Sequence, residues 1–324
     1  MPHKVKAIPF GERPGPEPYN ASEVLALGDA TFLFCDNNVS NAFFEFRLKR
    51  DGTLRGHVVR RRIEGLPPRA IDDIEGIEIV QAAGRTYIFG TSSLCLKTRK
   101  GHHPKKKRGK VVASHESIVR IAVGPGRRFR AEVMPDFRPW LIDHAPWLKR
   151  AARLIPDDGG LNVEALSWDP RRNALLFGLR TPVIDGRPTV LRVRLRKIDG
   201  PWTVDNVQML PPLKLGVRDD NDEAGIRAMS LDQSTGTSLI ILGNSTSRSK
   251  ARFKLYAWDG NPRGIVQHYD KVKFHKRMKV EGVTRGTVHG RPAVMFVDDG
   301  GGFQALWSDD PRLDSVVRPS RSRA

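Results

Sequence analysis

A short motif recurs five times along the chain, and in each copy a charged residue sits beside an apolar residue and a small one. The charged residues are Glu23, Glu75, Glu164, Arg227 and Glu281. They are 52, 89, 63 and 54 residues apart, which sets a unit of about 50 to 60 residues with one insertion. Self-similarity at such a period is typical of solenoids and propellers. The motif therefore predicts a repeat architecture in which the five charged side chains gather in one place.

Three further strands are predicted after each motif. An apolar second run and an alternating third run are rich in β-branched or aromatic residues, and a fourth, outer run is weaker. The second strands are expected at 31–35, 85–89, 174–177, 238–242 and 293–297, the third at 42–48, 117–123, 189–195, 252–258 and 303–307, and the fourth near 55–61, 128–134, 204–209 and 265–269. Regular four-stranded units of this kind indicate an all-β fold, the β-propeller, which protects sheet edges by radial repetition.

Five repeat units predict one five-bladed domain in residues 1–312. A sixth, degenerate unit within 92–160 is the alternative. The last unit lacks an outer strand, so we expect residues 4–10 to supply it and close the ring. Residues 313–324 are rich in Arg and Ser and predict a frayed basic tail.

One segment, 139–155, breaks the β pattern because its apolar residues recur at helical spacing. Pro146 would interrupt a single helix, so the sequence predicts two short ones. We expect Trp140 and Trp147 to pack this insertion against the propeller.

The net charge of +19, from 55 Lys and Arg against 36 Asp and Glu, predicts attraction to anions such as nucleic acid or an acidic protein surface. A basic loop at 97–110 is expected to overhang the channel mouth, with a merely solvated loop as the alternative. The anion-binding candidates are Lys105, Lys106, Lys107, Arg108, Lys110, Arg248 and Lys250, and Arg180 is expected beside the charged ring at the mouth.

The stretch 162–169, followed by 175–180 and the turn 185–188, resembles a bacterial propeller family known only by a domain-of-unknown-function label. The similarity spans about residues 20–307. More distantly, the chain is similar to phytase-like esterase propellers and to gluconolactonase and regucalcin-type propellers. That resemblance implies acidic residues at the channel mouth that hold a divalent cation. The chain departs from the pattern at Arg227, where a carboxylate ligand would be wanted.

A ring of four carboxylates needs compensation, since a pair about 8 Å apart repels by roughly 2 kcal/mol at an effective dielectric constant near 20. Ca²⁺ or another divalent cation is one solution. Pairing with Arg180 and Arg227 is a second, and raised carboxyl pKa values are a third. A purely structural role, in which each Glu accepts hydrogen bonds from backbone N–H groups, also remains open. The candidate cation ligands are Glu75, Glu164, Glu281 and Asn162, with Asp36, Asn244 and Asp298 as further oxygen donors.

Several other kinds of site are excluded by the sequence. It contains no G-x-S-x-G, H-E-x-x-H or G-x-x-x-x-G-K-[ST] motif, and its two cysteines match no metal spacing. We expect a cytoplasmic protein without a membrane partner, because no membrane span or signal peptide is recognisable. Two hypotheses follow. The first is a non-enzymatic binding or scaffold propeller with an anionic partner and no catalytic residue. The alternative is a divalent-cation-dependent hydrolase of phosphoesters or lactones.

Overall fold

The computed structural model describes residues 4–11, 18–67, 70–71, 74–98, 111–113, 116–216 and 223–313. The first half of the chain forms β1 (Ile8–Pro9), β2 (Ala21–Gly28), β3 (Thr31–Asp36), β4 (Val39–Arg47), β5 (Val59–Glu64), β6 (Ile74–Ala82), β7 (Arg85–Ser92), β8 (Leu96–Thr98), β9 (Val111–Ala113), β10 (Ile118–Gly124), β11 (Arg128–Met134) and α1 (Phe137–His144). The second half forms β12 (Asn162–Asp169), β13 (Ala174–Ile184), β14 (Arg187–Arg196), β15 (Thr203–Met209), β16 (Ala224–Asp232), β17 (Thr237–Asn244), β18 (Lys254–Trp258), β19 (Gln267–His268), β20 (Val280–Val288), β21 (Arg291–Asp298) and β22 (Gly302–Trp307).

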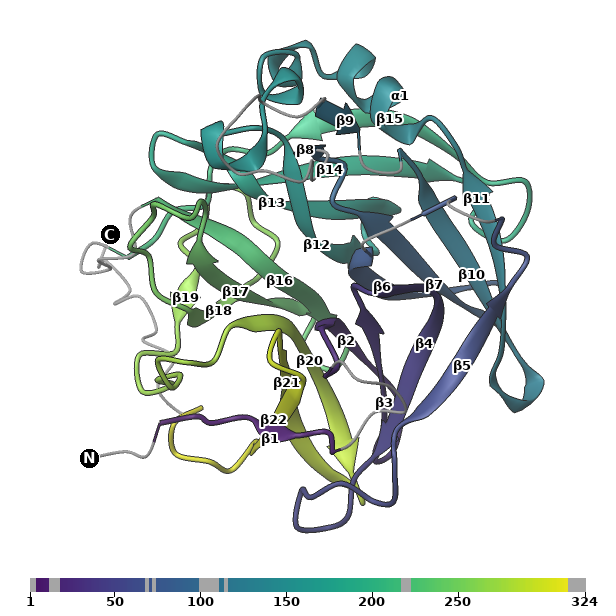
Figure 1. The fold of residues 1–324 in the computed structure, drawn as a ribbon, viewed down its shortest axis with the longest axis vertical. Helices are drawn as coiled ribbons and strands as arrows, with labels where there is room; N and C mark the ends of the chain where they lie inside the picture. The colour runs from purple at the N-terminus through teal and green to yellow at the C-terminus, as the bar shows by residue number, and fades with distance from the viewer. Residues whose placement is uncertain are drawn as a thin grey trace.

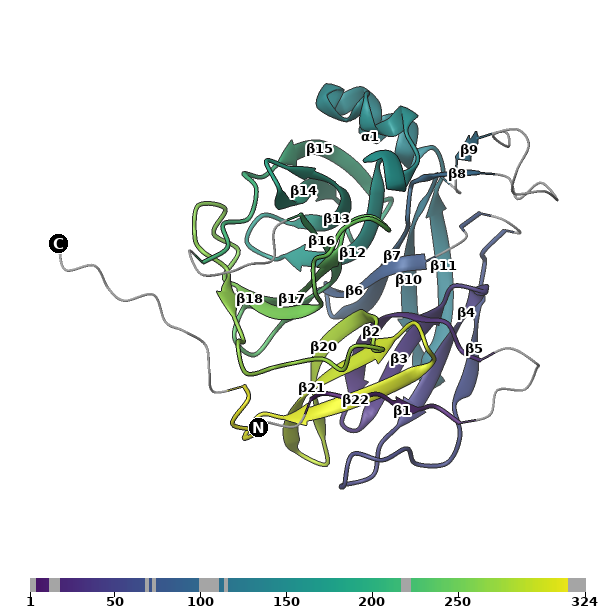
Figure 2. The same ribbon diagram turned by 60° about the vertical axis from the view of Figure 1, so that its left-hand side comes forward.

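The large sheets radiate from a common centre (Figures 1 and 2). Three have four strands, in the orders β12-β13-β14-β15, β16-β17-β18-β19 and β20-β21-β22-β1. The fourth has eight, β2-β3-β4-β5-β11-β10-β7-β6, and its halves are joined by a short parallel pairing of the outer strands β5 and β11. The innermost strands β2, β6, β12, β16 and β20 contact one another in that order, and β20 contacts β2. The chain thus has a β-propeller-like all-β fold, as its sequence predicted.

The innermost strands are buried on both faces because neighbouring sheets cover them. All eight residues of β12 are buried, and hydrophobic clusters fill the spaces between successive sheets. This explains why these strands read as apolar runs rather than as a strict alternation.

The helical insertion is present, but its described residues form one α-helix and three 3₁₀ turns in place of the two short helices predicted. The helix α1 is followed by 3₁₀ turns at Pro146–Leu148, Ala151–Arg153 and Pro156–Asp158, so Pro146 does end the first helix. Trp140 packs against the hydrophobic cluster of this region, but Trp147 is 39% exposed and does not anchor the insertion as expected. Phe137 supplies the second anchor instead, with its ring centroid 5.3 Å from that of Phe177.

Other boundaries differ locally from the expected ones. The outer strand expected at 55–61 is β5, at 59–64, because Gly52 and Gly56 lie in left-handed turn conformations before it. The strand expected at 265–269 shortens to the two residues of β19. Lys97 and Thr98, expected in the basic loop, belong to β8, which pairs with β9. The rest of that loop, 99–110, and residues 314–324 of the tail lie outside the described residues.

The N-terminal strand β1 pairs with β22, the last strand, through Ile8–Phe303 and Pro9–Gly302. Phe10 follows β1 and is 2% exposed. Its ring centroid lies 4.4 Å from that of Phe34 and 5.1 Å from that of Phe303, so one side chain joins the first and last sheets. Within the described residues, no helix is long and apolar enough to cross a membrane.

Replacing Phe10 with leucine should therefore lower the free energy of unfolding by about 1 kcal/mol, because aromatic pairs contribute beyond the area they bury. Urea denaturation monitored by circular dichroism measures the change. Ile8→Leu, two residues earlier on β1, is the control, since Ile8 is 37% exposed. Equal effects of the two substitutions would argue against an aromatic closure of the ring.

Candidate functional site at the channel mouth

The five motif residues all lie near the start of an innermost strand, where the strand pairing shifts by one residue. On β16, Ile226 pairs with Leu242 and Ala228 with Ile241, which leaves Arg227 between two successive pairs. The same shift occurs around Glu75 on β6, Glu164 on β12 and Glu281 on β20, and it includes both Ser22 and Glu23 on β2. A β-bulge re-aims the side chain of the extra residue. The repeated motif is therefore a repeated bulge.

The small residue that follows the charge also has a structural cause. A Cβ atom added at Gly76 would lie 2.6 Å from the backbone nitrogen of Leu166, and one at Gly282 would lie 2.8 Å from that of Val24. Both neighbours belong to the next innermost strand around the ring. The bulges thus bring adjacent strands into backbone contact, which only a small residue permits.

Arg227 joins two of the predicted carboxylates. Its Nε lies 2.9 Å from Glu164 Oε2 and donates to Glu281 Oε2 at 3.1 Å, and its Nη2 donates to Glu281 Oε1. Arg180 Nη1 donates to the other oxygen of Glu164 at 2.7 Å, as does Asn162 Nδ2 at 3.0 Å. Two arginines and two glutamates, from three successive sheets, therefore form one buried ion cluster.

The pKa values of Arg227 and Glu281 are both raised above their ordinary values in the ion cluster. Burial alone would lower the pKa of Arg227, but Glu164, Glu281 and Glu75 raise it above its ordinary value, so Arg227 stays charged. Burial raises the pKa of Glu281 to about 7, against the opposing effect of Arg227. Glu75 is half-buried at the start of β6 and acts on Arg227 through its charge.

Two of the predicted cation ligands, Glu164 and Glu281, face arginines. Glu281 accepts hydrogen bonds from Arg227, and Glu164 Oε1 accepts them from Arg180 and Asn162. Glu164 Oε2 lies 2.9 Å from Arg227 Nε, with which it forms an ion pair but no hydrogen bond. Across the described residues, no group of three or more His, Cys, Asp and Glu side chains is arranged to hold a metal ion. The additional candidate ligands Asp36 and Asp298 face backbone groups instead. Asp36 accepts a hydrogen bond from Asn38 N at 2.9 Å, and Asp298 accepts one from Gly302 N at 2.9 Å.

Glu23 lies deeper than the expected mouth position. Its side chain is fully buried and accepts hydrogen bonds from the backbone N–H groups of Val24 at 3.1 Å, Val283 at 3.0 Å and Met229 at 3.3 Å. It thereby connects β2 to β20 and β16 across the axis of the ring. Burial raises the pKa of Glu23 well above its ordinary value, despite these backbone hydrogen bonds. Of the four glutamates, Glu23 shows the backbone-bonding arrangement that was one of the alternatives.

Glu78 is a further buried carboxyl that the motif search missed. It accepts from the backbone N–H groups of Ile79 and Leu231, both at 2.8 Å, and burial raises its pKa to about 8. The available signal was a single charge inside an otherwise apolar run, Ile77 to Val80, of a predicted innermost strand.

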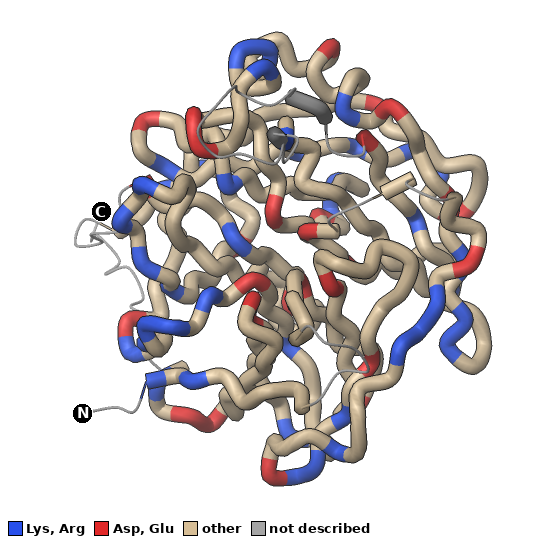
Figure 3. The backbone as a smooth tube through the Cα atoms, viewed as in Figure 1, with Lys and Arg blue, Asp and Glu red and all other residues tan. Residues whose placement is uncertain are grey.

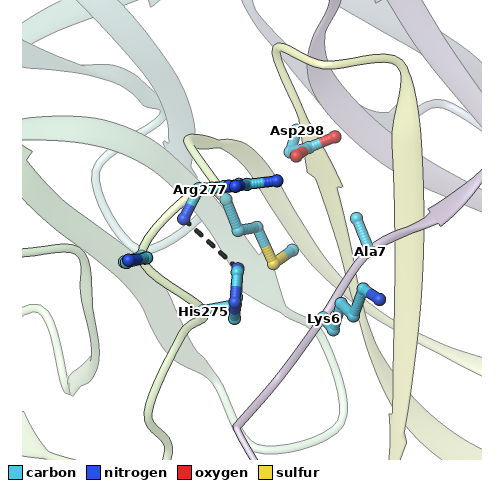
Figure 4. Close-up of a pocket in the computed structure, with 7 residues that line it drawn as sticks. Lys6, Ala7, His275, Arg277 and Asp298 are labelled. Carbon is cyan, nitrogen blue, oxygen red and sulfur yellow. Dashed lines mark hydrogen bonds between the residues drawn. The ribbon is translucent and has the colours of Figure 1, made fainter.

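A basic groove opens beside the ion cluster. The cavity measures about 1330 Å³, and among the described residues nine Lys or Arg side chains line it against three Asp or Glu. The cations are Lys4, Arg180, Arg227, Lys250, Arg252, Lys254, Lys273, Lys276 and Lys279, and the anions are Asp270, Glu281 and Asp299. An adjoining cavity of about 450 Å³ shares His275, Lys276 and Met278 and adds Lys6 and Arg277 (Figure 4).

Figure 3 shows Asp and Glu positions near the centre of the ring and many Lys and Arg positions towards its outside. Among the predicted anion-binding residues, Lys250 lines the groove, whereas Arg248 is exposed on the same loop. Lys105, Lys106, Lys107, Arg108 and Lys110 lie outside the described residues. Sequence reasoning missed the second wall of the groove, at 270–279, which has no repeat signature.

Residues 141–294 match the model of a family described as "Protein of unknown function (DUF3616)". This confirms, for that part of the chain, the resemblance to a family known only by such a label. The sequence matches no curated protein.

Solved structures with a similar fold include the GH43_1 enzyme from Xanthomonas citri, at 12% identity and a TM-score of 0.47, with 97% of this chain and 96% of that chain covered. They also include exo-beta-1,3-galactanase from Phanerochaete chrysosporium, at 9% identity and a TM-score of 0.47, with 94% of this chain covered. The match spans 63% of the galactanase chain, less than two thirds of its length.

Proposed function

We propose that the protein is a non-enzymatic, five-bladed β-propeller that binds an anionic partner in the basic groove at its channel mouth. The blade number comes from dividing the eight-stranded sheet at the β5–β11 pairing, which gives five four-stranded units with one motif each. The N-terminal strand β1 then completes the last blade and closes the domain. This division leaves no unit for a sixth blade in the described part of residues 92–160.

The charge of the groove carries the proposal. Nine cations face three anions within one cavity, and the basic side chains of Lys250, Lys273 and Lys276 are exposed there. An excess of this size attracts a polyanion and releases its counterions on binding. Phe253 and Phe274 also line the groove, and aromatic rings beside cations suit the bases and phosphates of a single-stranded nucleic acid. An acidic protein surface offers the same charge without bases.

The hydrolase alternative finds less support. Its cation would need the oxygens of Glu164 and Glu281, which contact Arg180 and Arg227 instead. Those arginines compensate the carboxylates without any metal. The cluster then forms the floor of a binding groove, where it holds two guanidinium groups in fixed positions.

The triple substitution Lys250→Gln, Lys273→Gln and Lys276→Gln tests the groove. Binding of a fluorescent single-stranded oligonucleotide should weaken, and the slope of log affinity against log salt should fall by about 2, at roughly 0.7 per lost phosphate contact. Fluorescence anisotropy between 50 and 200 mM salt, conditions in which such slopes are measurable, gives both quantities.

The matched control is Arg62→Gln, Arg128→Gln and Arg130→Gln, which removes the same charge from exposed positions on the outer strands β5 and β11. This control should keep most of the affinity. An equal loss in the two triple variants would mean that net charge, not the groove, drives binding. A poly-glutamate peptide as competitor shows whether an acidic protein surface binds in the same place.

A further inference from the structure

A second basic cavity lies on the sheet β12-β13-β14-β15, at the end of that sheet opposite the channel mouth. It measures about 780 Å³ and is lined by four arginines and three side-chain amides, together with Ala174 and Val207. The four arginines are Arg171, Arg172, Arg192 and Arg194, and the amides are Asn173, Asn206 and Gln208. Strand β12 begins at the mouth with Asn162 and Glu164 and ends at Asp169, just before Arg171. The cavity is therefore separate from the groove, and none of the described Asp or Glu residues lines it.

The strand register builds this cavity. Arg192 and Arg194 are two residues apart on β14, so they share one face of the sheet. Directly opposite on β15 are Gln208, which pairs with Arg192, and Asn206, which pairs with Arg194. Arg171 and Arg172 come from the turn between β12 and β13 and complete one end. The result is a concave set of hydrogen-bond donors on regular strands.

The carboxylates behind the cavity do not balance its charge. Asp169 lies 3.2 Å from Arg172 Nη1 and 3.4 Å from Arg192 Nε, so one buried carboxylate serves two arginines. Asp205 is 4.0 Å from Arg194 but only 2.8 Å from Arg196, outside the cavity lining. Four lining cations against these two carboxylates leave an excess of at least two positive charges.

Arg192 carries the decisive observation. Its side chain is 10% exposed, and its Nη2 is buried without a hydrogen-bond partner in the described part of the chain. Its Nη1 donates to Gln208 Oε1 at 3.3 Å. A buried charged donor without a partner is costly, so a ligand that accepts from it would be stabilised. Burial and, secondarily, repulsion from Arg172 lower the pKa of Arg192 below its ordinary value, and a bound anion would relieve that repulsion.

We propose that this cavity binds a phosphate group, with Arg192 and Arg172 as its principal contacts. A phosphate dianion matches the excess of two charges. Guanidinium groups bind phosphate through pairs of parallel hydrogen bonds, which makes arginine better suited than lysine to this task. Arg171 and Arg194 add charge from the rim, and the amides of Asn206 and Gln208 supply further donors. The phosphate group is free inorganic phosphate or the phosphate ester of a small molecule.

Isothermal titration with inorganic phosphate tests the site in the full chain that carries the triple groove substitution, so that binding in the groove is suppressed. We expect one phosphate per chain. Arg192→Gln should weaken it at least about tenfold, and Arg171→Gln, at an exposed position, about threefold, in keeping with the strength of charge-assisted hydrogen bonds. Arg192→Lys should recover only part of the affinity, because lysine keeps the charge but not the paired donors.

The control Arg128→Gln should bind phosphate like the parent. Unchanged affinity in Arg192→Gln or Arg171→Gln would overturn the proposal, as would loss of all phosphate binding on introduction of the groove substitutions. Arg171→Gln keeps the test valid if Arg192→Gln does not fold. Titrations with glucose 6-phosphate and phosphoserine identify the source of the phosphate group. If either ester binds more tightly than inorganic phosphate, the ligand is a phosphate ester of a small molecule. Acetate binding as tight as phosphate would contradict the ligand class.

Discussion

Replacing Arg227 with alanine is expected to lower the free energy of unfolding by about 3–5 kcal/mol, the usual effect of removing one partner of a buried ion pair. Arg227 side-chain exposure is 8%, and its guanidinium contacts both Glu164 and Glu281. Without it, two carboxylates from adjacent sheets would face each other across a buried space. Urea denaturation at pH 8 measures the loss.

The loss should depend on pH. The pKa of Glu281 is about 7 even with Arg227 present, and burial is the main cause of its elevation. Removing Arg227 takes away the opposing effect, so this carboxyl should remain protonated to higher pH. A protonated carboxyl needs no counter-charge, and the destabilisation should therefore be smaller at pH 5 than at pH 8.

Two controls separate charge from geometry. Arg227→Lys keeps the charge but cannot contact both glutamates through a planar fork, so it should recover only part of the stability. Arg180→Gln removes the second arginine partner of Glu164. Because the Arg180 side chain is 21% exposed, this substitution should lower the free energy of unfolding less than Arg227→Ala does. A loss below about 1 kcal/mol for Arg227→Ala would show that the ion pairs are as weak as exposed ones.

The sequence predicted the repeat and its central charges, because a bulge imposes a local pattern. A charged residue followed by a glycine, as at Gly76 and Gly282, can be recognised without a structure. The glycine is needed because a neighbouring backbone comes close at that one position. The odd member of the set, Arg227, already indicated a built-in counter-charge. These features depend on a few neighbouring residues, and periodicity amplifies them five times.

Features that depend on distant contacts were harder to predict. Nothing near Glu23 in the sequence shows that it accepts from Met229 N, 206 residues away. Glu78 has no counterpart in the other repeat units, so alignment of the units passes over it. The second basic cavity, which we propose binds phosphate, depends on which face of β14 carries Arg192 and Arg194 and on their register with β15. A shift of one residue would turn that face to the other side.

Stability should fall as pH rises through the neutral range, because burial raises the pKa of three carboxyls, those of Glu23, Glu281 and Glu78. Glu78 shows the size of the effect. Its folded-state pKa is about 8 against an ordinary value of 4.5, so the folded protein holds a proton that the unfolded chain releases. The contribution is fully present below about pH 4.5 and is lost as pH rises through 8. The shift corresponds to about 5 kcal/mol at most. Glu23, whose pKa is also raised by burial, acts in the same direction.

Glu78→Gln should remove the part of this slope that comes from Glu78, because glutamine does not titrate. Urea denaturation from pH 5 to 8.5 at constant ionic strength gives the difference between variant and parent, in which the effect of the net charge largely cancels. At pH 5 the variant should be less stable by about 1–3 kcal/mol, since the amide nitrogen cannot accept from Ile79 or Leu231 N–H. That deficit should shrink or reverse above pH 8, where the parent must ionise a buried carboxyl. Glu132→Gln, at a side chain 59% exposed, should run parallel to the parent. A parallel profile for Glu78→Gln as well would mean that the carboxyl between β6 and β16 is ionised throughout this range.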